Sequence, residues 1–393
     1  MSTTIPLACP PIPLVRIALI GLGARGMKTL ERYAYIPGAQ IVCLADLDAR
    51  RVEAAQQTLR LTGRPTALGL TGPGAWREAC RLPEADLVYI CTEWSTHATM
   101  AIEAMNCGKH AAVEVPAATT LEECRRLVRT AETTRRHCFM AENCCYDLFA
   151  LQTLEIHRQG LLGHITHLEG AYIHDLTPQT TDNTPHTPGT RHGWMERSCA
   201  LHGGNPYPTH GIGPMAQLLS LHEPDPMERL VSLTARGIVD PADPNRPVRG
   251  RVNTSIIQTR RGTTLMLQLD VTTPRPYSRL QTVCGTHGYL QKYPLPTVRT
   301  PETPGILTGE AALSYMDRFS TSPAALLWKQ GHSLRVPNEM NYAMDARLIH
   351  CLRHGHPLDI SVYDAAEWSA LAELTRRSAQ QGGMPVQIPQ FRS

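Results

Sequence analysis

The sequence predicts an α/β protein of two domains. Residues 1–145 should form a doubly wound parallel sheet, and residues 146–393 an α+β domain with an open, mostly antiparallel sheet. Short apolar runs alternate with helical segments in the first part, a glycine-rich turn follows the first run, and longer alternating strands appear after residue 146. At 393 residues the chain also exceeds the usual size of one hydrophobic core.

The first part of the chain alternates between strands and helices. Residues 15–20 (VRIALI) form a continuous apolar run of strand length, as expected for a parallel strand buried on both faces. Right-handed crossovers between such strands give a parallel sheet covered by helices. The further predicted strands are 40–45, 85–91, 110–114 and 137–142, and the predicted helices run from the glycine turn to Tyr35 and over 49–61, 97–107 and 121–134.

The second part has a different pattern. Apolar and polar residues alternate in long segments, which is typical of antiparallel strands with one exposed face. These segments are 164–174, 227–235, 254–259 and 263–271. Residues 177–206 and 240–250 are rich in Pro, Gly, Thr and His and are predicted to be long loops, a class that is often functional. We expect the C-terminal segment to pack back on the first domain.

The glycine-rich turn predicts a dinucleotide site. Gly21, Gly23 and Gly26 form a G-x-G-x-x-G pattern between a strand and a helix, which is the context that gives this motif its meaning. The three glycines allow a tight turn, close approach of the backbone to a pyrophosphate, and helix–strand packing in a Rossmann domain. Asp46 ends the second strand, where a carboxylate accepts hydrogen bonds from ribose hydroxyls and favours NAD over NADP. Arg50-Arg51 nearby leave NADP open.

Three polar segments follow strands at the carboxyl edge of this sheet, where such folds bind ligands. They are residues 92–97 (TEWSTH), 114–116 (EVP) and 142–147 (ENCCYD). With these segments the chain resembles the Gfo/Idh/MocA oxidoreductase superfamily, which pairs a Rossmann domain with an open antiparallel sheet. Dehydrogenases of that superfamily usually have Glu-Lys-Pro where this chain has Val115 in the middle position, and valine transfers no proton.

Several sequence blocks resemble one branch of that superfamily, glycoside hydrolase family 109. The resemblance spans almost the whole chain and implies an NAD-dependent N-acetylgalactosaminidase. Such an enzyme oxidises a sugar at carbon 3, eliminates the group at carbon 1 after loss of the carbon 2 proton, adds water and restores the hydroxyl. The blocks are ENCCYD (142–147), GAYIHDL (170–176), NPYPTHGIGP (205–214), TPRPYSR (273–279) and PLDISVYDAAEWS (357–369).

The resemblance also implies roles for individual residues. Tyr172 matches the proposed base for carbon 2, and His174 lies two residues on, on the same strand face. We expect His210, beside Tyr207, to accept the hydroxyl proton and Glu142 to assist the leaving group. The expected sugar contacts are Tyr172, Tyr207, Thr209, His210, Tyr277 and Arg197. The expected cofactor contacts beyond the three glycines and Asp46 are Ala24, Arg25, Trp94, Ser95, Thr96, His97, Glu114, Val115, Asn143 and Tyr207.

Two departures from the family pattern leave the substrate open. The family usually has Arg directly after the Trp that precedes NPYPTHG, whereas Met195 follows Trp194 here and Arg197 stands two positions later. Residues 337–341 (PNEMN) also replace the family's His-Gly-Gly-Met-Asp. The alternatives are a sugar or polyol dehydrogenase of the same superfamily, and an NAD-bound sensor without turnover.

Composition limits the partners. A net charge of +3 with mixed signs gives no basic stripe, so we expect no nucleic acid, and the lack of an eighteen-residue apolar run predicts no membrane span. The twelve cysteines lack zinc-ligand spacing, which predicts reduced thiols, no metal and a cytoplasmic location. Residues 1–13 lack the features of an export signal and are expected to be a short leader. The exposed sheet face favours a homodimer.

Overall fold

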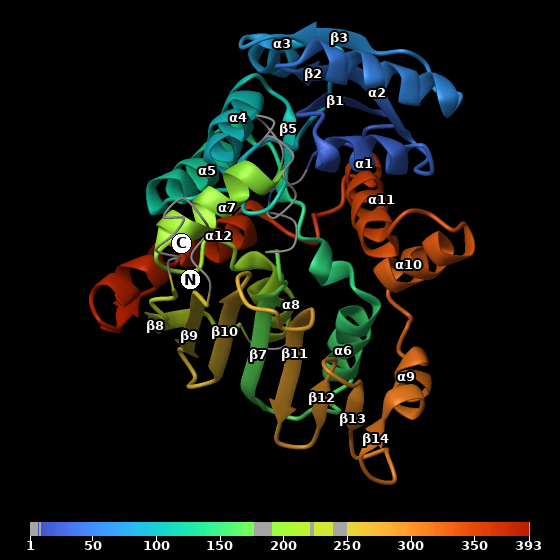
Figure 1. Cartoon of the computed structure of the whole chain (residues 1–393). Helices are drawn as coiled ribbons and strands as arrows, with labels where there is room; N and C mark the ends of the chain where they lie inside the picture. The colour runs from blue at the N-terminus through green and yellow to red at the C-terminus, as the bar shows by residue number, and fades with distance from the viewer. Residues whose placement is uncertain (1–6, 8, 177–190, 221–223, 239–249, 393) are drawn as a thin grey trace.

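The computed structural model describes residues 7, 9–176, 191–220, 224–238 and 250–392, although for a few residues of 191–200 it describes the backbone alone. The described chain contains two sheets, one in each part of the sequence (Figure 1). The predicted fold class is therefore confirmed. No helix among the described residues is long and apolar enough to span a membrane.

The N-terminal sheet is parallel and has the strand order β3-β2-β1-β4-β5-β6. The strands are β1 (Val15–Ile20), β2 (Ala39–Asp46), β3 (Leu68–Thr71), β4 (Leu87–Ile90), β5 (His110–Val113) and β6 (Cys138–Met140). The helices are α1 (Ala24–Tyr33), α2 (Ala49–Leu61), α3 (Ala75–Arg81), α4 (Trp94–Asn106) and α5 (Leu121–Thr134). The strand β3 and the helix α3 were not predicted from the sequence. The strand is a four-residue, largely exposed edge strand with a glycine in it, so it has little apolar pattern to detect.

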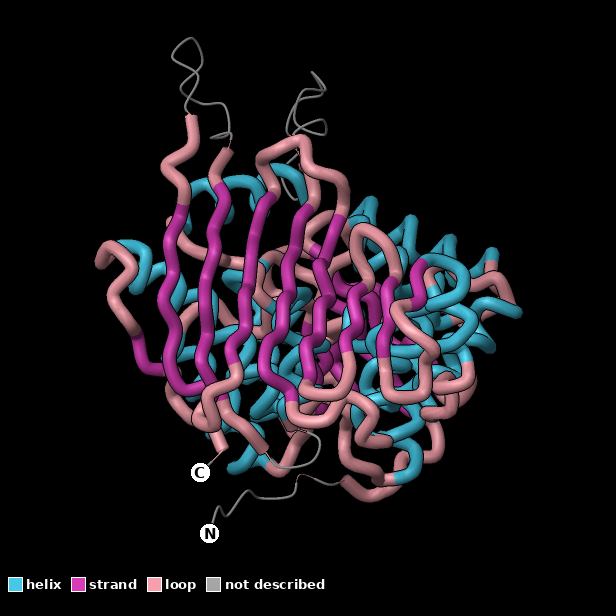
Figure 2. The backbone as a smooth tube through the Cα atoms, turned by 90° about the horizontal axis from the view of Figure 1, so that it is seen from below, coloured by secondary structure: helices cyan, strands magenta, loops and turns pink. Residues whose placement is uncertain are grey.

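The second sheet is mixed and mostly antiparallel, with the order β14-β13-β12-β11-β7-β10-β9-β8-β15. Among the described strands of this second sheet, only the β7–β10 pair is parallel. The strands are β7 (Ile165–Ile173), β8 (Met227–Thr234), β9 (Val252–Thr259), β10 (Thr264–Asp270), β11 (Ser278–Gly285), β12 (Tyr289–Gln291), β13 (Thr297–Arg299), β14 (Leu307–Thr308) and β15 (Val386–Gln387). Figure 2 shows this sheet from its open face, with the helices behind it.

Several helices cover the inner face of the second sheet or connect it to the first. Residues 143–146 form a single 3-10 turn, η1 (Asn143–Tyr146), directly after the N-terminal sheet. The helix α8 packs on β7, β10 and β11, and α12 packs on β8. The remaining helices are α6 (Leu148–Arg158), α7 (Arg191–His202), α8 (Thr209–Leu219), α9 (Gly309–Asp317), α10 (Pro323–Ser333), α11 (Glu339–His354) and α12 (Val362–Gln380).

The predicted loop 177–206 is wrong in its second half. Residues 177–190 lie outside the described residues, but Arg191–His202 form the helix α7. Trp194 and Met195 are the inward-facing side chains of this helix, and Met195 is only 2% exposed. Because the apolar residues of α7 show almost no helical periodicity, the sequence pattern did not reveal it.

The C-terminal helices α11 and α12 pack back on the Rossmann domain. In Figure 1, α11 lies directly beside α1. The ion pair between Arg32 of α1 and Asp345 of α11 has an Nη2–Oδ2 distance of 2.8 Å and is fully buried. Glu373 of α12 accepts a hydrogen bond from the backbone N–H of Leu121, at the start of α5. The two parts of the chain therefore share a continuous core.

The described part of the predicted leader also packs on these helices. The backbone N–H of Ile12 donates to the carbonyl of Leu352 at 3.1 Å, and Cys9 is buried. Residues 1–6 and 8 lie outside the described residues, so the expectation about export stays a prediction.

Candidate active site

The glycine turn has the geometry that a pyrophosphate requires. Gly21 has φ of 88°, a left-handed conformation that favours glycine, and a Cβ on Gly26 would lie 1.9 Å from the Gly21 carbonyl oxygen. Gly23 precedes α1 without a side-chain cap, so the first-turn N–H groups of this helix face outward with the positive end of its dipole. The turn therefore fits a dinucleotide phosphate.

Asp46 lies at the carboxyl end of β2, beside this turn. Its Oδ2 accepts the backbone N–H of Leu22 at 2.6 Å, and its Oδ1 accepts that of Asp48 at 2.9 Å. The Arg51 guanidinium is 3.9 Å from the same carboxylate. Asp46 is thus fixed to the glycine turn where the ribose of a dinucleotide lies in this fold.

Arg25 connects the turn to the rest of the cofactor side. Its Nε donates to Glu114 at 2.6 Å, and its Nη2 donates to Asn341 of α11 at 3.1 Å. Asn341 belongs to the 337–341 segment that departs from the family pattern, so this departure lies against the cofactor turn. The adjacent Val115 is buried, and Ala24 begins α1.

The 92–97 segment forms the start of α4. Thr92 and Thr96 share a hydrogen bond between their hydroxyl oxygens at 2.7 Å, and Ser95 donates to the Glu93 carboxylate at 3.1 Å. The buried ring of His97 lies between the carbonyl oxygens of Pro116, at 2.8 Å from Nδ1, and of Thr92, at 3.0 Å from Nε2. This geometry gives His97 a role in holding two segments together rather than in presenting a free donor to a ligand.

Trp94 links the cofactor segment to the expected sugar residues. Its ring stacks on Tyr207, with centroids 5.1 Å apart and planes at 16°, and meets Trp194 of α7 edge-on at 5.0 Å. Met195, which follows Trp194, is buried and carries no charge to a substrate. The side chain of Arg197 lies outside the described residues, so its expected sugar contact stays a prediction.

The expected sugar residues come together because α8 lies unusually close to β7. A Cβ on Gly170 of β7 would be 2.0 Å from the carbonyl oxygen of Gly211 in α8. This approach brings His210 next to Tyr172, with ring centroids 5.2 Å apart. Residues far apart in the sequence thus form one cluster of rings.

Tyr207, His210 and Glu142 form a hydrogen-bonded chain. The Tyr207 hydroxyl lies 2.9 Å from His210 Nε2, and His210 Nδ1 lies 2.7 Å from Glu142 Oε1. Glu142 is fully buried and also accepts the backbone N–H of Cys144 at 3.0 Å. Asn143, next to it, is buried as well.

The Glu142–His210 contact shifts the pKa of both groups. Burial disfavours the imidazolium, but the neighbouring Cys144 sulfur and the Glu142 carboxylate outweigh burial and raise the pKa of His210 to about 10. Burial likewise disfavours the Glu142 carboxylate, but the nearby His210 holds its pKa below the ordinary value. At neutral pH the pair is therefore an imidazolium and a carboxylate. Ionised Glu142 is a poor acid for a leaving group, in contrast to the expected role.

Tyr172 and His174 form a second hydrogen-bonded pair. The Tyr172 hydroxyl is 2.9 Å from His174 Nδ1, and Tyr172 is buried. Tyr277 meets His174 edge-on at 5.3 Å and is 45% exposed, at the rim of the cluster. Thr209 is fully buried beside Glu142, so it lies behind the other sugar residues rather than at the surface.

A charged group that was not predicted from the sequence lies beside this cluster. Arg279, only 3% exposed, donates to Asp147 at 2.8 Å, and Lys292 contacts the same carboxylate at 2.5 Å. Burial disfavours the charged form of Asp147, but the two cations lower its pKa to about 2. The next two residues, Leu280 and Gln281, have φ of 56° and 59° where the β11–β7 register shifts. This bulge turns Arg279 inward, and its place in the TPRPYSR block was the available signal.

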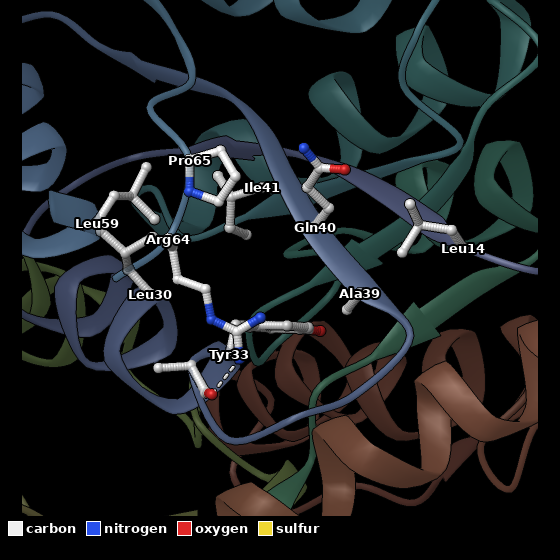
Figure 3. A pocket seen from close by; sticks show the side chains of 10 residues that line it. Leu14, Leu30, Tyr33, Ala39, Gln40, Ile41, Leu59, Arg64 and Pro65 are labelled. Atoms are coloured by element: carbon white, nitrogen blue, oxygen red, sulfur yellow. Dashed lines mark hydrogen bonds between the residues drawn. The ribbon is translucent and has the colours of Figure 1, made fainter. Parts of the chain in front are cut away.

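One cavity lies apart from this site. It has a volume of about 250 Å³ and lies at the C-terminal end of α1, between that helix and β2 (Figure 3). Arg64 reaches across it toward the carbonyl of Ala34, and the other walls are mostly apolar. None of the expected site residues lines this cavity.

Two family models match the chain. Residues 15–142 match the NAD-binding Rossmann fold of the Gfo/Idh/MocA oxidoreductase family, and residues 146–393 match the C-terminal domain of glycosyl hydrolase 109. Glycosyl hydrolase family 109 protein 2 of Phocaeicola vulgatus is 48% identical over 398 residues, with 98% of this chain and 96% of the relative covered. The alpha-N-acetylgalactosaminidase of Bacteroides fragilis is 48% identical over 399 residues, with 98% and 93% covered.

Solved structures share the fold at low sequence identity. Levoglucosan dehydrogenase in complex with NADH and levoglucosan aligns with a TM-score of 0.74 and 19% identity, covering 96% of this chain and 100% of that one. An NAD-binding oxidoreductase from Klebsiella pneumoniae aligns with a TM-score of 0.75 and 18% identity, with the same coverage. At this identity the likeness establishes the fold alone.

Proposed function

The chain belongs to the glycosyl hydrolase 109 family, and from that premise we propose that it is an NAD-dependent α-N-acetylgalactosaminidase. The family and the NAD-binding fold make it a glycosidase that uses a redox cofactor. The sugar is the proposed part, and it rests on the activity named for the B. fragilis relative. The observation that carries the mechanism is the Tyr207–His210–Glu142 chain beside the Tyr172–His174 pair.

NAD supplies a hydride acceptor for carbon 3 of the sugar and returns the hydride at the end of the cycle. The residues that would hold it are those of the glycine turn, together with Asp46 and the first-turn N–H groups of α1. Arg25 and Asn341 hold the turn from the other side. Trp94, stacked on Tyr207, separates this cofactor side from the sugar side.

His210 exchanges the proton of the hydroxyl at carbon 3. Only neutral His210 can accept that proton, and its raised pKa means that it holds one at neutral pH. The enzyme must therefore release this proton before oxidation, whereas the protonated form is ready to restore the hydroxyl at the end. Glu142 acts through His210 as a positioning residue, because its carboxylate sets the charge and orientation of the ring.

Tyr172 takes the proton from carbon 2. The ketone at carbon 3 acidifies this proton, and His174 accepts the phenolic proton of Tyr172 through their 2.9 Å hydrogen bond, which makes the phenolate available as base. The electron pair left at carbon 2 expels the group at carbon 1. Water then adds to carbon 1 as carbon 2 regains a proton, so that the sequence is redox-neutral.

Turnover of an aryl α-N-acetylgalactosaminide in deuterated water tests this function. We expect aryl alcohol release, deuterium at carbon 2 of the sugar and no net NADH. Tyr172→Phe should stop both release and exchange, and Tyr289→Phe on β12 is the matched control that should keep both. NADH accumulation on a free sugar without aryl release would instead establish the dehydrogenase, and tight NAD without any turnover would establish the sensor.

We also propose that the chain forms a homodimer in the cytoplasm. Val231, Leu233 and Ile256 are exposed apolar residues on the open face of β8 and β9, which supports association through this face. Buried unpaired thiols such as those of Cys43 and Cys91 fit a reducing compartment. Light scattering on the purified protein tests the dimer, and Leu233→Glu should give a monomer.

A further inference from the structure

We propose that Glu142, Cys144 and His210 form a binding site for a thiophilic divalent cation such as Zn²⁺, and that the bound cation inhibits the enzyme. Cysteine spacing in the sequence gave no sign of a metal site, because the three residues come from two distant segments that meet only in the fold. The binding site stands on the geometry alone. The inhibition rests on the function proposed above.

The geometry of the three side chains suits one cation. One ligand atom from each lies within 4.8 Å of the other two, and all three residues are buried or nearly so. Tetrahedral zinc, with bonds of about 2.0–2.3 Å, needs ligand atoms roughly 3.3–3.8 Å apart. Glu142 Oε1 and His210 Nδ1 are now 2.7 Å apart, so this pair must open by roughly half an ångström to take a tetrahedral cation.

The donor set also suits zinc. Carboxylate, thiolate and imidazole are its ordinary protein ligands, and a site with three of them leaves a fourth position open. The second oxygen of Glu142, Oε2, is buried and makes no hydrogen bond of good geometry among the described residues, and the Thr209 hydroxyl lies beside the same carboxylate. A buried carboxylate oxygen of this kind carries a desolvation cost that a cation in the cluster would remove. Nothing in the proposed reaction uses the Cys144 thiol.

Binding exchanges protons for the cation. The cation forms bonds to the Cys144 sulfur, a His210 nitrogen and a Glu142 oxygen, while the thiol and the imidazolium each release one proton to solvent. The summed charge of the three side chains is zero before binding, and with the cation it is zero afterwards. A metal-bound His210 can no longer exchange a proton with the sugar hydroxyl, so occupancy blocks the oxidation step.

Cys145 provides a matched control. It is adjacent in sequence and equally buried, but its sulfur packs toward Gly213 of α8 and does not belong to the cluster. Cys144→Ser and Cys145→Ser therefore remove the same atom from neighbouring positions, and only the first removes a ligand.

The experiment titrates the chelator-treated, NAD-bound protein with Zn²⁺ by calorimetry and with Co²⁺ by absorption. We expect one tight equivalent and a thiolate-to-cobalt charge-transfer band. Cys144→Ser should weaken metal binding by at least about tenfold, because even the loss of a residue that only supports a metal ligand has an effect of this size. It should also abolish the charge-transfer band. Cys145→Ser should match wild type in both measurements. Wild-type affinity in Cys144→Ser, or cobalt binding without the band, would overturn the site.

A separate measurement tests inhibition. The rate of each variant with Zn²⁺ is divided by its own rate without Zn²⁺, so that any change in basal activity cancels. Wild type and Cys145→Ser should be inhibited in parallel with site occupancy, and Cys144→Ser should resist. Full activity at full occupancy would overturn the inhibition and leave the site standing. Absence of glycosidase activity in every sample would reject the proposed function, while the binding data would still decide the site.

Discussion

Replacing Glu142 with glutamine should change the charge of His210. The carboxylate lies 2.7 Å from His210 Nδ1 and, together with the Cys144 sulfur, raises the imidazole pKa to about 10. An amide of the same shape keeps a hydrogen-bond acceptor but not the charge. Removing an opposite charge at this distance should lower the His210 pKa by roughly 1–3 units.

The expected stability change follows from the same shift. Because the folded-state pKa is raised above the ordinary 6.5, the stabilisation is complete below about pH 6.5 and is lost as pH rises through about 10. At pH 7 the raised pKa is worth about 4 kcal/mol, of which Glu142→Gln should remove about 1–4 kcal/mol, depending on the size of the pKa change. The difference between wild type and variant should therefore shrink as pH approaches 10.

Two assays measure these effects. An NMR titration of the His210 ring, assigned with His210→Gln, gives the pKa directly, and urea unfolding at several pH values gives the stability. Cys144→Ser, measured alongside, separates the contribution of the Cys144 sulfur to the His210 pKa. A wild-type His210 that titrates near 6.5, or a stability difference independent of pH, would refute the ion pair. If His210 accepts the hydroxyl proton, wild-type activity should rise toward pH 10 and the variant's rise should occur at lower pH.

Three further predictions concern other parts of the chain. Asp46→Ala removes the acceptor of the Leu22 N–H and the expected ribose contact, so the affinity for NADH should fall at least about tenfold in a fluorescence titration. An unchanged affinity would contradict the cofactor site. Gly26→Ala places a methyl group 1.9 Å from a carbonyl oxygen, so thermal unfolding should show a loss of about 1–3 kcal/mol together with weak NADH binding. Asp345→Asn leaves Arg32 buried without its counter-charge and should cost about 3–5 kcal/mol in urea unfolding; a change below 1 kcal/mol would show that the pair is solvated.

The Rossmann half was predictable because its signals are local. A buried parallel strand such as β1 is apolar throughout, and the glycine turn follows it directly. The elements that escaped prediction lack such a local signal. The edge strand β3 is short and exposed, and the helix α7 packs through Trp194 on Trp94, which lies elsewhere in the sequence.

The candidate site was predictable as a set of residues but not as chemistry. Sequence motifs named His210 and Glu142 separately, yet the charge of each depends on a contact across 68 positions. The same holds for Arg279, whose inward direction depends on a β-bulge that no residue pattern announces. Sequence motifs therefore identify the residues of the site. Their protonation states depend on distances between side chains, which are known only from the three-dimensional structure.

The joint between α1 and α11 has a consequence for how the protein is made. Arg32 is synthesised more than three hundred residues before its partner Asp345, and Arg25 is synthesised more than three hundred residues before its partner Asn341. When only the first 145 residues have left the ribosome, the nucleotide-binding half of the chain is exposed to solvent. The Arg32 guanidinium, which is buried in the complete fold, then has no counter-charge. Until α11 is made, the Arg32 guanidinium stays in water and the hydrogen bond from Arg25 to Asn341 cannot form, so the cofactor turn gains its full support only with about the last fifty residues.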